Sequence, residues 1–354
     1  MLRRGVHLGF VTGESDHHPP ESGAIVEAWR NDEAVRLAGA VGTDSFRGKI
    51  AQARKLMERV LEGESPADVF TDSPYDEWLA GDKSGAYFAL VSAIHDQGDP
   101  QEIEKVSFDA EANGGVLAED LWCKASWLSY HEDDASLRFR FSFGMEDHED
   151  VAAQPERQQW SARLCDALFP ESAAVVANPS IRELLGKVLG GEPAFVERIV
   201  YFNAPNGGAQ FHHDVERGHA GVIYAQMSGN TFWLALNKQT LMDEIISFAN
   251  NPANADAIAQ VLPSADDQAT LQGLADERHE LSDYMEALDH ELIEALIDRS
   301  PTFTARLIEQ GYAHILQPGD AMLLPQRNLD TCVWHSVICL GDEPGEGLSF
   351  ALRR

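Results

Sequence analysis

The chain has 354 residues, of which 58 are acidic and 27 are basic, so its formal net charge at pH 7 is −31; 44% of its residues are hydrophobic. This composition is typical of a globular protein with one large or two modest domains, and a chain of this length can bury a core without disulfides. Negative charge of this size repels nucleic-acid phosphates and anionic lipids, which excludes nucleic acid and membrane surfaces as partners.

The cysteines and the N-terminus indicate an intracellular protein. Cys123, Cys165, Cys332 and Cys339 are scattered and form no CxxC pair, which favours reduced thiols over a zinc cage or a disulfide framework. The apolar stretch 7–12 is too short for a secretory signal, and no stretch approaches the ~20 apolar residues that cross a bilayer. We therefore expect a soluble, cytoplasmic protein.

The first part of the chain predicts helices. Apolar residues recur near a 3.6-residue period at 22–37 and 46–61, so residues 1–115 are expected to form a mainly helical N-terminal region. His17 and His18 have no partner at a metal-binding spacing, and we expect them in a solvated loop.

The pattern changes after Gly114. Leu137 to Phe143 alternates apolar and polar residues, which predicts a half-buried strand, and 147–150 form an acidic turn. Further amphipathic helices are expected at 158–168 and 179–189. Further strands are expected at 195–202, at 221–237 with a turn at 228–230, and at 312–317, 321–324, 334–340 and 347–352.

Residues 241 to about 310 interrupt this β region with a helical block rich in Ala, Glu, Asp and Leu. Many short strands separated by Gly and Pro turns predict a barrel or jelly roll rather than a parallel α/β sheet. We expect a mainly β protein with helices. Its domains would be 1–115, which is helical, and 116–354, which is the barrel with a helical insertion at about 241–310.

One segment contains candidate metal ligands. Residues two apart in an extended chain point to the same side, so His212 and Asp214 can both face into a barrel while His213 faces away. A metal ion needs a further ligand, and His335 is the best candidate for the second imidazole. Two histidines and one carboxylate leave about three open positions, which suits non-haem Fe(II) oxygenases. A carboxylate at 214 favours hydroxylation, because a halide-transferring site needs a further open position there.

His-x-Asp is common by chance, but its surroundings resemble a known family. Four blocks follow in that family's order: GGAQFHHD at 207–214, IYAQMSGNTFWL at 223–234, LQPGDAMLLP at 316–325 and WHSV at 334–337. They resemble the JmjC-type, cupin-like oxygenases that use Fe(II) and 2-oxoglutarate, and residues 183–214 are also similar to the phytanoyl-CoA dioxygenase branch of the same superfamily. The resemblance covers about 137–354.

The resemblance implies a fold, a metal and an activity. The fold would be a double-stranded β-helix, also called a jelly roll or cupin core. His212, Asp214 and His335 would be the iron ligands, and no further catalytic residue is expected. The activity would be that of an Fe(II)- and 2-oxoglutarate-dependent dioxygenase that hydroxylates its substrate.

The expected site for 2-oxoglutarate departs from the family pattern. Where JmjC-like proteins have a Lys that holds the distal carboxylate, this chain has Thr231. A hydroxyl cannot neutralise a carboxylate, so another cation is expected. Lys238 is out of phase with Thr231 and is expected to point out of the barrel. Arg353 on the last strand is our first candidate, although it could equally be part of a solubilising tail. Arg138 and Arg140, on the polar side of their strand, are reserve candidates that we expect to be exposed to solvent.

Other residues have two interpretations each. Tyr224 is expected to contact the cosubstrate, and Trp233 and Asn203 the substrate, but both aromatic residues could equally be plain core residues. Cys332, close to His335, is expected to be a buried spectator. His219 is expected in a flexible loop, with substrate contact or metal ligation as the alternative.

Two other functions stay open. The missing Lys favours a metal-dependent cupin enzyme that does not use 2-oxoglutarate. A non-catalytic cupin-fold binding protein, whose helices contact a partner, is the other alternative. The expected substrate is a small molecule or a peptide; the fold class does not identify it, and the oligomeric state is open.

Overall fold

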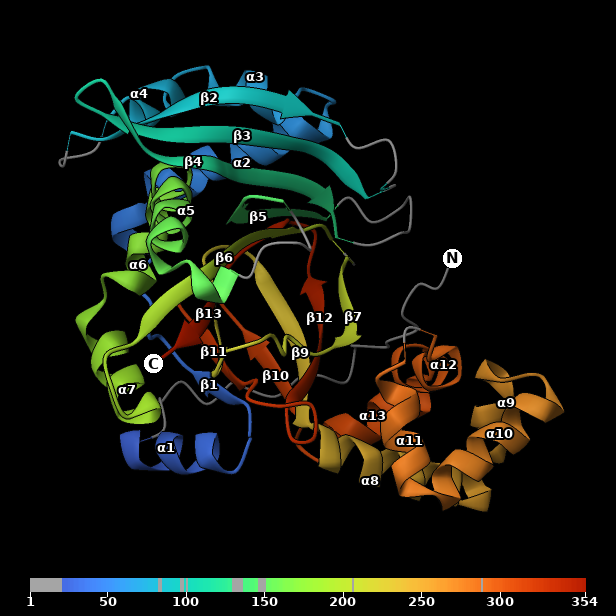
Figure 1. Cartoon of the computed structure of the whole chain (residues 1–354). Helices are drawn as coiled ribbons and strands as arrows, with labels where there is room; N and C mark the ends of the chain where they lie inside the picture. The colour runs from blue at the N-terminus through green and yellow to red at the C-terminus, as the bar shows by residue number, and fades with distance from the viewer. Residues whose placement is uncertain are drawn as a thin grey trace.

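The structure is a computed structural model, and it describes residues 21–81, 85–95, 99, 101–128, 136–145, 151–205, 207–287 and 289–354. The sequence expectations for His17, His18 and 147–150 lie outside these residues. The molecule contains two antiparallel sheets with helices around them (Figure 1). No helix in the described ranges is long and apolar enough to span a membrane.

The larger sheet has nine strands in the order β1-β11-β8-β13-β6-β5-β4-β3-β2. Its strands are β1 (Val35–Leu37), β2 (Tyr87–Ile94), β3 (Glu102–Ala112), β4 (Gly115–Trp127), β5 (Leu137–Phe143), β6 (Ala194–Asn203), β8 (Gly221–Gln226), β11 (Ala321–Pro325) and β13 (Gly345–Arg353). The smaller sheet has the order β10-β9-β12-β7, with β7 (Gly208–His212), β9 (Asn230–Asn237), β10 (Ala313–Leu316) and β12 (Val333–Leu340). The strands expected after Gly114 are confirmed, within a few residues at their ends.

The two sheets pack face to face across an apolar core. From the larger sheet come Val222, Tyr224, Met322 and Leu324, and from the smaller sheet Trp233, Ala235, Leu316, Val333 and Val337. Side chains of two antiparallel sheets that interdigitate in this way form a sandwich core. The expectation of a β core with helices is confirmed, and the packing of the two antiparallel sheets is consistent with a jelly-roll-like core.

β5 shows how the alternating sequence produces two different faces. Phe139 and Phe141 are buried on one face and pack on Phe169, with ring centroids 5.6 and 6.0 Å away. Arg138 and Arg140 alternate with them and are half-buried on the opposite face. A period of two therefore separates an aromatic core from a polar surface that faces the functional cavity.

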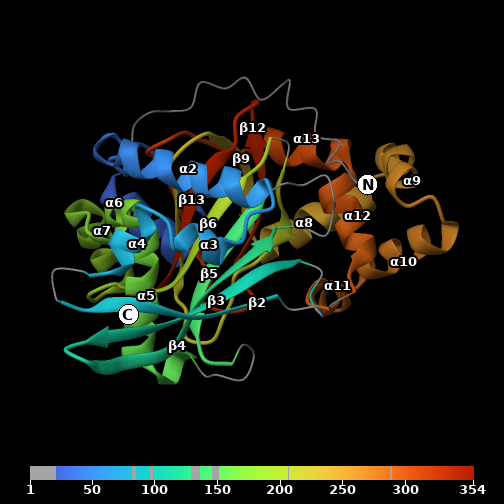
Figure 2. The same cartoon turned by 90° about the horizontal axis from the view of Figure 1, so that it is seen from above.

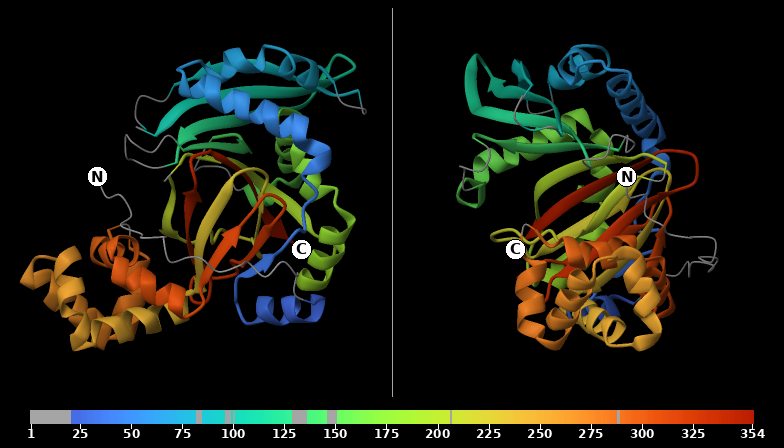
Figure 3. Two further views of the ribbon diagram at one scale, coloured as in Figure 1. Left: turned by 180° about the vertical axis from the view of Figure 1, so that it is seen from behind. Right: turned by 90° about the vertical axis from the view of Figure 1, so that its right-hand side faces the viewer.

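Helices cover the sheets in two groups (Figures 1 and 2). The first group shares one apolar cluster with the larger sheet and comprises α1 (Ser22–Arg30), α2 (Arg47–Leu61), α3 (Pro66–Phe70), α4 (Tyr75–Leu79), α5 (Pro155–Leu168), α6 (Ala173–Val176) and α7 (Pro179–Leu189). The second group is the helical block α8 (Lys238–Ala249), α9 (Ala255–Val261), α10 (Ala265–Asp276), α11 (Arg278–Met285), α12 (Glu291–Arg299) and α13 (Pro301–Glu309). This block projects beside the smaller sheet, with which it shares a separate core (Figure 3).

The expectation of a helical region over residues 1–115 is partly wrong. Helices occupy much of 22–79, but β2 and β3 occupy most of 87–112. Val106, Phe108 and Ala110 of β3 are fully buried and alternate with half-buried residues, which is the period of a strand. β3 and β4 form a hairpin at the position where we placed the domain boundary; the division into two domains stays a prediction.

Two buried carboxyl groups meet between the larger sheet and its helices. Glu171 lies in the 3-10 helix η4 (Pro170–Ser172) and Glu346 lies in β13; both are at most 2% exposed. Their oxygens have no hydrogen-bond partner outside the pair among the described residues. Burial raises the pKa of Glu171 to about 7. Burial, and then the charge of Glu171, raises the pKa of Glu346 well above its ordinary value.

We expect the free energy of unfolding to fall as the pH rises from about 5 to 8. The folded pair retains protons that the unfolded chain releases near pH 4.5, so its stabilisation is complete below that pH and is lost as the pH passes 7. Glu346→Gln should make this decline shallower, because it removes one of the two buried carboxyl groups whose pKa is raised. Urea unfolding at several pH values measures it, with the exposed Glu62→Gln as control. Parallel profiles for wild type and Glu346→Gln would contradict the prediction.

Candidate metal centre

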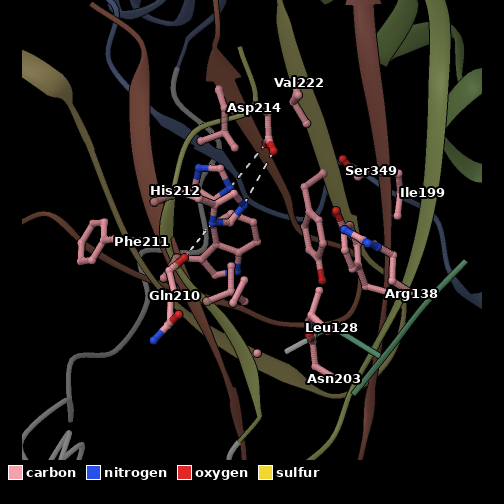
Figure 4. A pocket seen from close by; sticks show the side chains of 18 of the residues that line it. Leu128, Arg138, Ile199, Asn203, Gln210, Phe211, His212, Asp214, Val222 and Ser349 are labelled. Atoms are coloured by element: carbon pink, nitrogen blue, oxygen red, sulfur yellow. Dashed lines mark hydrogen bonds and ion pairs between the residues drawn. The ribbon is translucent and has the colours of Figure 1, made fainter. Parts of the chain in front are cut away.

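Two neighbouring strands of the smaller sheet bring the predicted ligands together. His212 ends β7 and lies directly opposite His335 of β12 in the antiparallel register, with imidazole centroids 4.2 Å apart. Asp214 follows His212 by two residues and faces both rings (Figure 4). Its carboxylate oxygens lie 3.7 Å from His212 Nε2 and 3.5 Å from His335 Nε2. The convergence predicted from the sequence is present.

A glycine allows β7 to approach β12 so closely. Gly208 has φ +142°, and a Cβ atom there would lie 2.1 Å from the carbonyl oxygen of Val337. The register also shifts between His335 and Val337, so the ladder is irregular next to the metal ligand. Such irregularities turn a side chain away from the regular pleat.

Hydrogen bonding, burial and ring stacking orient the two imidazoles. His212 Nδ1 donates to the carbonyl oxygen of Gln210 at 2.7 Å, so Nε2 is the ring nitrogen that faces Asp214. His335 is 4% exposed, and burial, reinforced by His212, lowers its pKa to about 3. The indole of Trp233 stacks on its ring at 5.4 Å and 13°. Both rings are therefore held in place by neighbouring groups.

This donor set fits a divalent transition metal. One ligand atom from each of His212, Asp214 and His335 lies within 4.8 Å of the others. Two neutral imidazoles and one carboxylate on one face are the ligands of non-haem iron sites with open positions. No residue must move far to bring the three atoms to metal-ligand distances.

A second cluster of potential ligands has a different character. Glu197, Glu216 and His219 also lie within 4.8 Å of one another. Arg140 Nε donates to Glu197 at 2.7 Å, and its guanidinium lies 3.8 Å from Glu216, so this cluster already contains its own cation. His219 lies in a loop as expected but is 4% exposed, with Nδ1 4.0 Å from Glu216.

A cavity of about 460 Å³ opens beside the metal ligands. One wall is β5 and β6, which contribute Arg138, Arg140, Tyr201 and Asn203. Another is α12 of the helical block, which contributes Glu294 and Asp298 together with its N-cap residue His290. The cavity therefore extends from the space between the two sheets, where Tyr224 and Trp233 line it, to the helical insertion.

On the barrel side, neutral side chains close the cavity. Thr231 Oγ1 donates to Gln226 Oε1 at 2.7 Å, and Trp233 Nε1 donates to Thr231 Oγ1 at 2.9 Å. The Tyr224 hydroxyl donates to the same Gln226 oxygen at 3.2 Å. Gly347 makes room for this tyrosine, because a Cβ atom there would lie 1.8 Å from its hydroxyl oxygen. The network is fully hydrogen-bonded and contains no cation.

The remaining residues expected at the site differ in whether they line the cavity. Tyr224, Trp233 and Asn203 line the cavity, whereas Thr231 is buried behind its aromatic wall. Their roles toward cosubstrate or substrate stay predictions. Cys332 is a buried thiol whose pKa is raised to about 12 by burial, in line with a spectator.

The basic residues differ most from expectation. Arg353 does not line the cavity: it donates to Gln158 Oε1 at 3.3 Å and to the carbonyl oxygen of Arg217 at 3.4 Å. It shares a face of β13 with Ser349, which does line the cavity, but lies four residues too far along the strand. Lys238 lies outside the cavity, as expected, and pairs with Glu286 at 2.7 Å.

Sequence reasoning missed Gln226 and α12. Gln226 lies two residues after Tyr224, so the alternation of β8 could have placed it on the same face. α12 had no such signal, because tertiary packing brings it to the cavity: Asp298 Oδ1 accepts the backbone N–H of Phe211 at 2.9 Å.

Known proteins offer distant likenesses. No family model and no curated protein matches the chain. A solved structure of YcfD, a ribosomal oxygenase from Escherichia coli, is 15% identical, with a TM-score of 0.26; the match covers 80% of this chain but only 44% of that one. A 2OG-Fe(II) oxygenase family oxidoreductase from Burkholderia pseudomallei is 10% identical over 97% and 96% of the two chains, with a TM-score of 0.33. A Pseudomonas putida prolyl-4-hydroxylase is 11% identical over 95% and 100%, with a TM-score of 0.28. We therefore derive the function from the geometry of the site.

We expect His335→Ala to weaken the binding of Fe(II), or of Co(II) as its oxygen-stable substitute, by more than about 100-fold, because two ligands hold the ion less well than three. Anaerobic titration with a competing chelator measures the affinity. His290→Ala is the matched control, since His290 lines the same cavity but stands outside the cluster. Equal affinity in wild type and His335→Ala would contradict the assignment.

Proposed function

We propose that the chain is a non-haem Fe(II)-dependent oxygenase that uses 2-oxoglutarate and hydroxylates, or otherwise oxidises, a C–H bond of a small molecule or peptide. The observation that carries the proposal is the convergence of His212, Asp214 and His335 beside the cavity. The resemblance of the four sequence blocks to JmjC-type, cupin-like oxygenases supports it.

We also assign the core to the double-stranded β-helix class. The strands β11-β8-β13-β6 of the larger sheet face β10-β9-β12-β7 of the smaller sheet, and successive strands from β6 to β13 change sheet at every step except between β9 and β10, which both lie in the smaller sheet. This alternation is how a chain winds two antiparallel sheets into one jelly roll.

Bound Fe(II), together with 2-oxoglutarate and dioxygen, would supply the oxidation of the C–H bond. The residues of this chain position that chemistry. The Gln210 carbonyl accepts a hydrogen bond from His212 Nδ1 and so turns Nε2 toward the metal position, and burial keeps the His335 imidazole neutral at neutral pH. Tyr224 and Trp233 wall off the barrel and exclude water from that side.

One observation favours a second candidate function. The network of Thr231, Gln226 and Tyr224 offers no positive charge to a dicarboxylate on the barrel side. A metal-dependent enzyme of the same fold that binds its substrate without 2-oxoglutarate is the alternative, and the same experiment separates the two.

We expect the Fe(II)-loaded protein to develop a weak visible absorption band with 2-oxoglutarate under anaerobic conditions, and to form succinate when air is admitted. Asp214→Ala should lower the rate of succinate formation by more than about 100-fold, because it removes a metal ligand. Absorption unchanged by the keto acid, with Fe(II) bound, would favour the second candidate. Unchanged metal content in His212→Ala would instead favour a binding protein without a metal centre.

A further inference from the structure

An anionic cosubstrate needs a cation in the cavity, and the barrel side supplies none. Thr231, which stands where JmjC-like proteins have a Lys, is fully buried and bonded to Gln226 and Trp233. A carboxylate placed there would displace satisfied hydrogen bonds without gaining charge neutralisation. The cation has to come from another wall.

Most basic side chains near the site already form ion pairs or hydrogen bonds with other groups. Arg140 pairs with Glu197, and Lys238 pairs with Glu286. Arg353 lies outside the cavity and donates to Gln158. None of the three can turn toward the metal centre without breaking these contacts.

Arg138 differs from them. It lines the cavity, and its Nε donates to the Ser126 hydroxyl at 3.3 Å. Within the described ranges no carboxylate lies at ion-pair distance from its guanidinium. The planar fork of its terminal nitrogens can therefore take a carboxylate in two parallel hydrogen bonds.

The register of the larger sheet surrounds Arg138 with hydroxyl groups. Arg138 lies opposite Tyr201, and in the next row Arg140, Ile199 and Ser349 lie side by side. Directly paired residues point to the same face, so this face turns toward the cavity. Figure 4 shows Arg138 near Ser349 and Ile199, on the side of the cavity away from His212 and Asp214.

Tyr201 connects this wall with the metal centre. After burial, the charge of Asp214 raises the pKa of the Tyr201 hydroxyl further, and the charge of Arg138 opposes it. One hydroxyl therefore experiences the charges of both groups.

We propose that Arg138, on a strand that flanks the barrel, binds the distal carboxylate of 2-oxoglutarate, so that the cosubstrate extends along the wall of β5 and β6 instead of into the barrel. The inference rests on the proposed function. It assigns the charge-neutralising role to a residue outside the eight strands of the jelly roll, because the polar side chains around Thr231 on the barrel side already hydrogen-bond to one another.

The test compares two keto acids on the Fe(II)-loaded protein without oxygen. 2-Oxobutanoate has the keto-acid end of 2-oxoglutarate but lacks the distal carboxylate. We expect Arg138→Gln to raise the dissociation constant of 2-oxoglutarate by about 10- to 100-fold, the effect of losing a hydrogen bond to a charged group. Its dissociation constant for 2-oxobutanoate should equal that of wild type. Arg138→Lys should lie in between, because it keeps the charge but loses the fork.

Arg353→Gln is the matched control and should bind both keto acids as wild type does. Fe(II) affinity and melting temperature, measured on every variant, separate a lost contact from a folding defect. Wild-type affinity for 2-oxoglutarate in Arg138→Gln, or a loss confined to Arg353→Gln, would overturn the inference alone. A wild-type protein that binds Fe(II) but neither keto acid would overturn the use of 2-oxoglutarate, and the inference with it.

Discussion

The pairing of β7 with β12 is the constraint on which the site depends. These strands are 120 residues apart in the chain, yet their ladder sets His212 directly opposite His335. Gly208 permits the close approach, since any side chain there would overlap the Val337 carbonyl group. Once the ladder forms, the position of Asp214 two residues after His212 follows from the geometry of an extended chain.

Much of this arrangement could be predicted because it depends on local periodicity. The alternation in 137–143 fixed β5 to the residue, and the two-residue spacing of His212 and Asp214 placed both on one side. β3 carries the same alternating signal at Val106, Phe108 and Ala110, but the helical periods at 22–61 were extended over it. That error came from applying one pattern to a long region instead of reading each segment separately.

The remaining site residues depend on information that no local pattern contains. The alternation in β13 correctly predicted that Ser349 and Arg353 share one face of the strand. The pairing of β13 with β6 and β8 determines how far the cavity extends along that face. Arg138 had the appearance of a solvent-facing residue, and only the position of β5 next to β6 turns it toward a cavity. Register between distant strands, and the packing of helices such as α12, emerge only from the assembled fold.

The hydrogen bond between Phe211 and Asp298 links the helical insertion to the metal centre. The amide that donates it belongs to the residue immediately before His212, and the acceptor belongs to α12, which also forms a wall of the cavity. A displacement of α12 therefore acts on the backbone next to His212 through this bond and through the hydrogen bond from Gln210 Nε2 to Glu294 Oε1. The position of the insertion and the placement of that imidazole are coupled through these contacts.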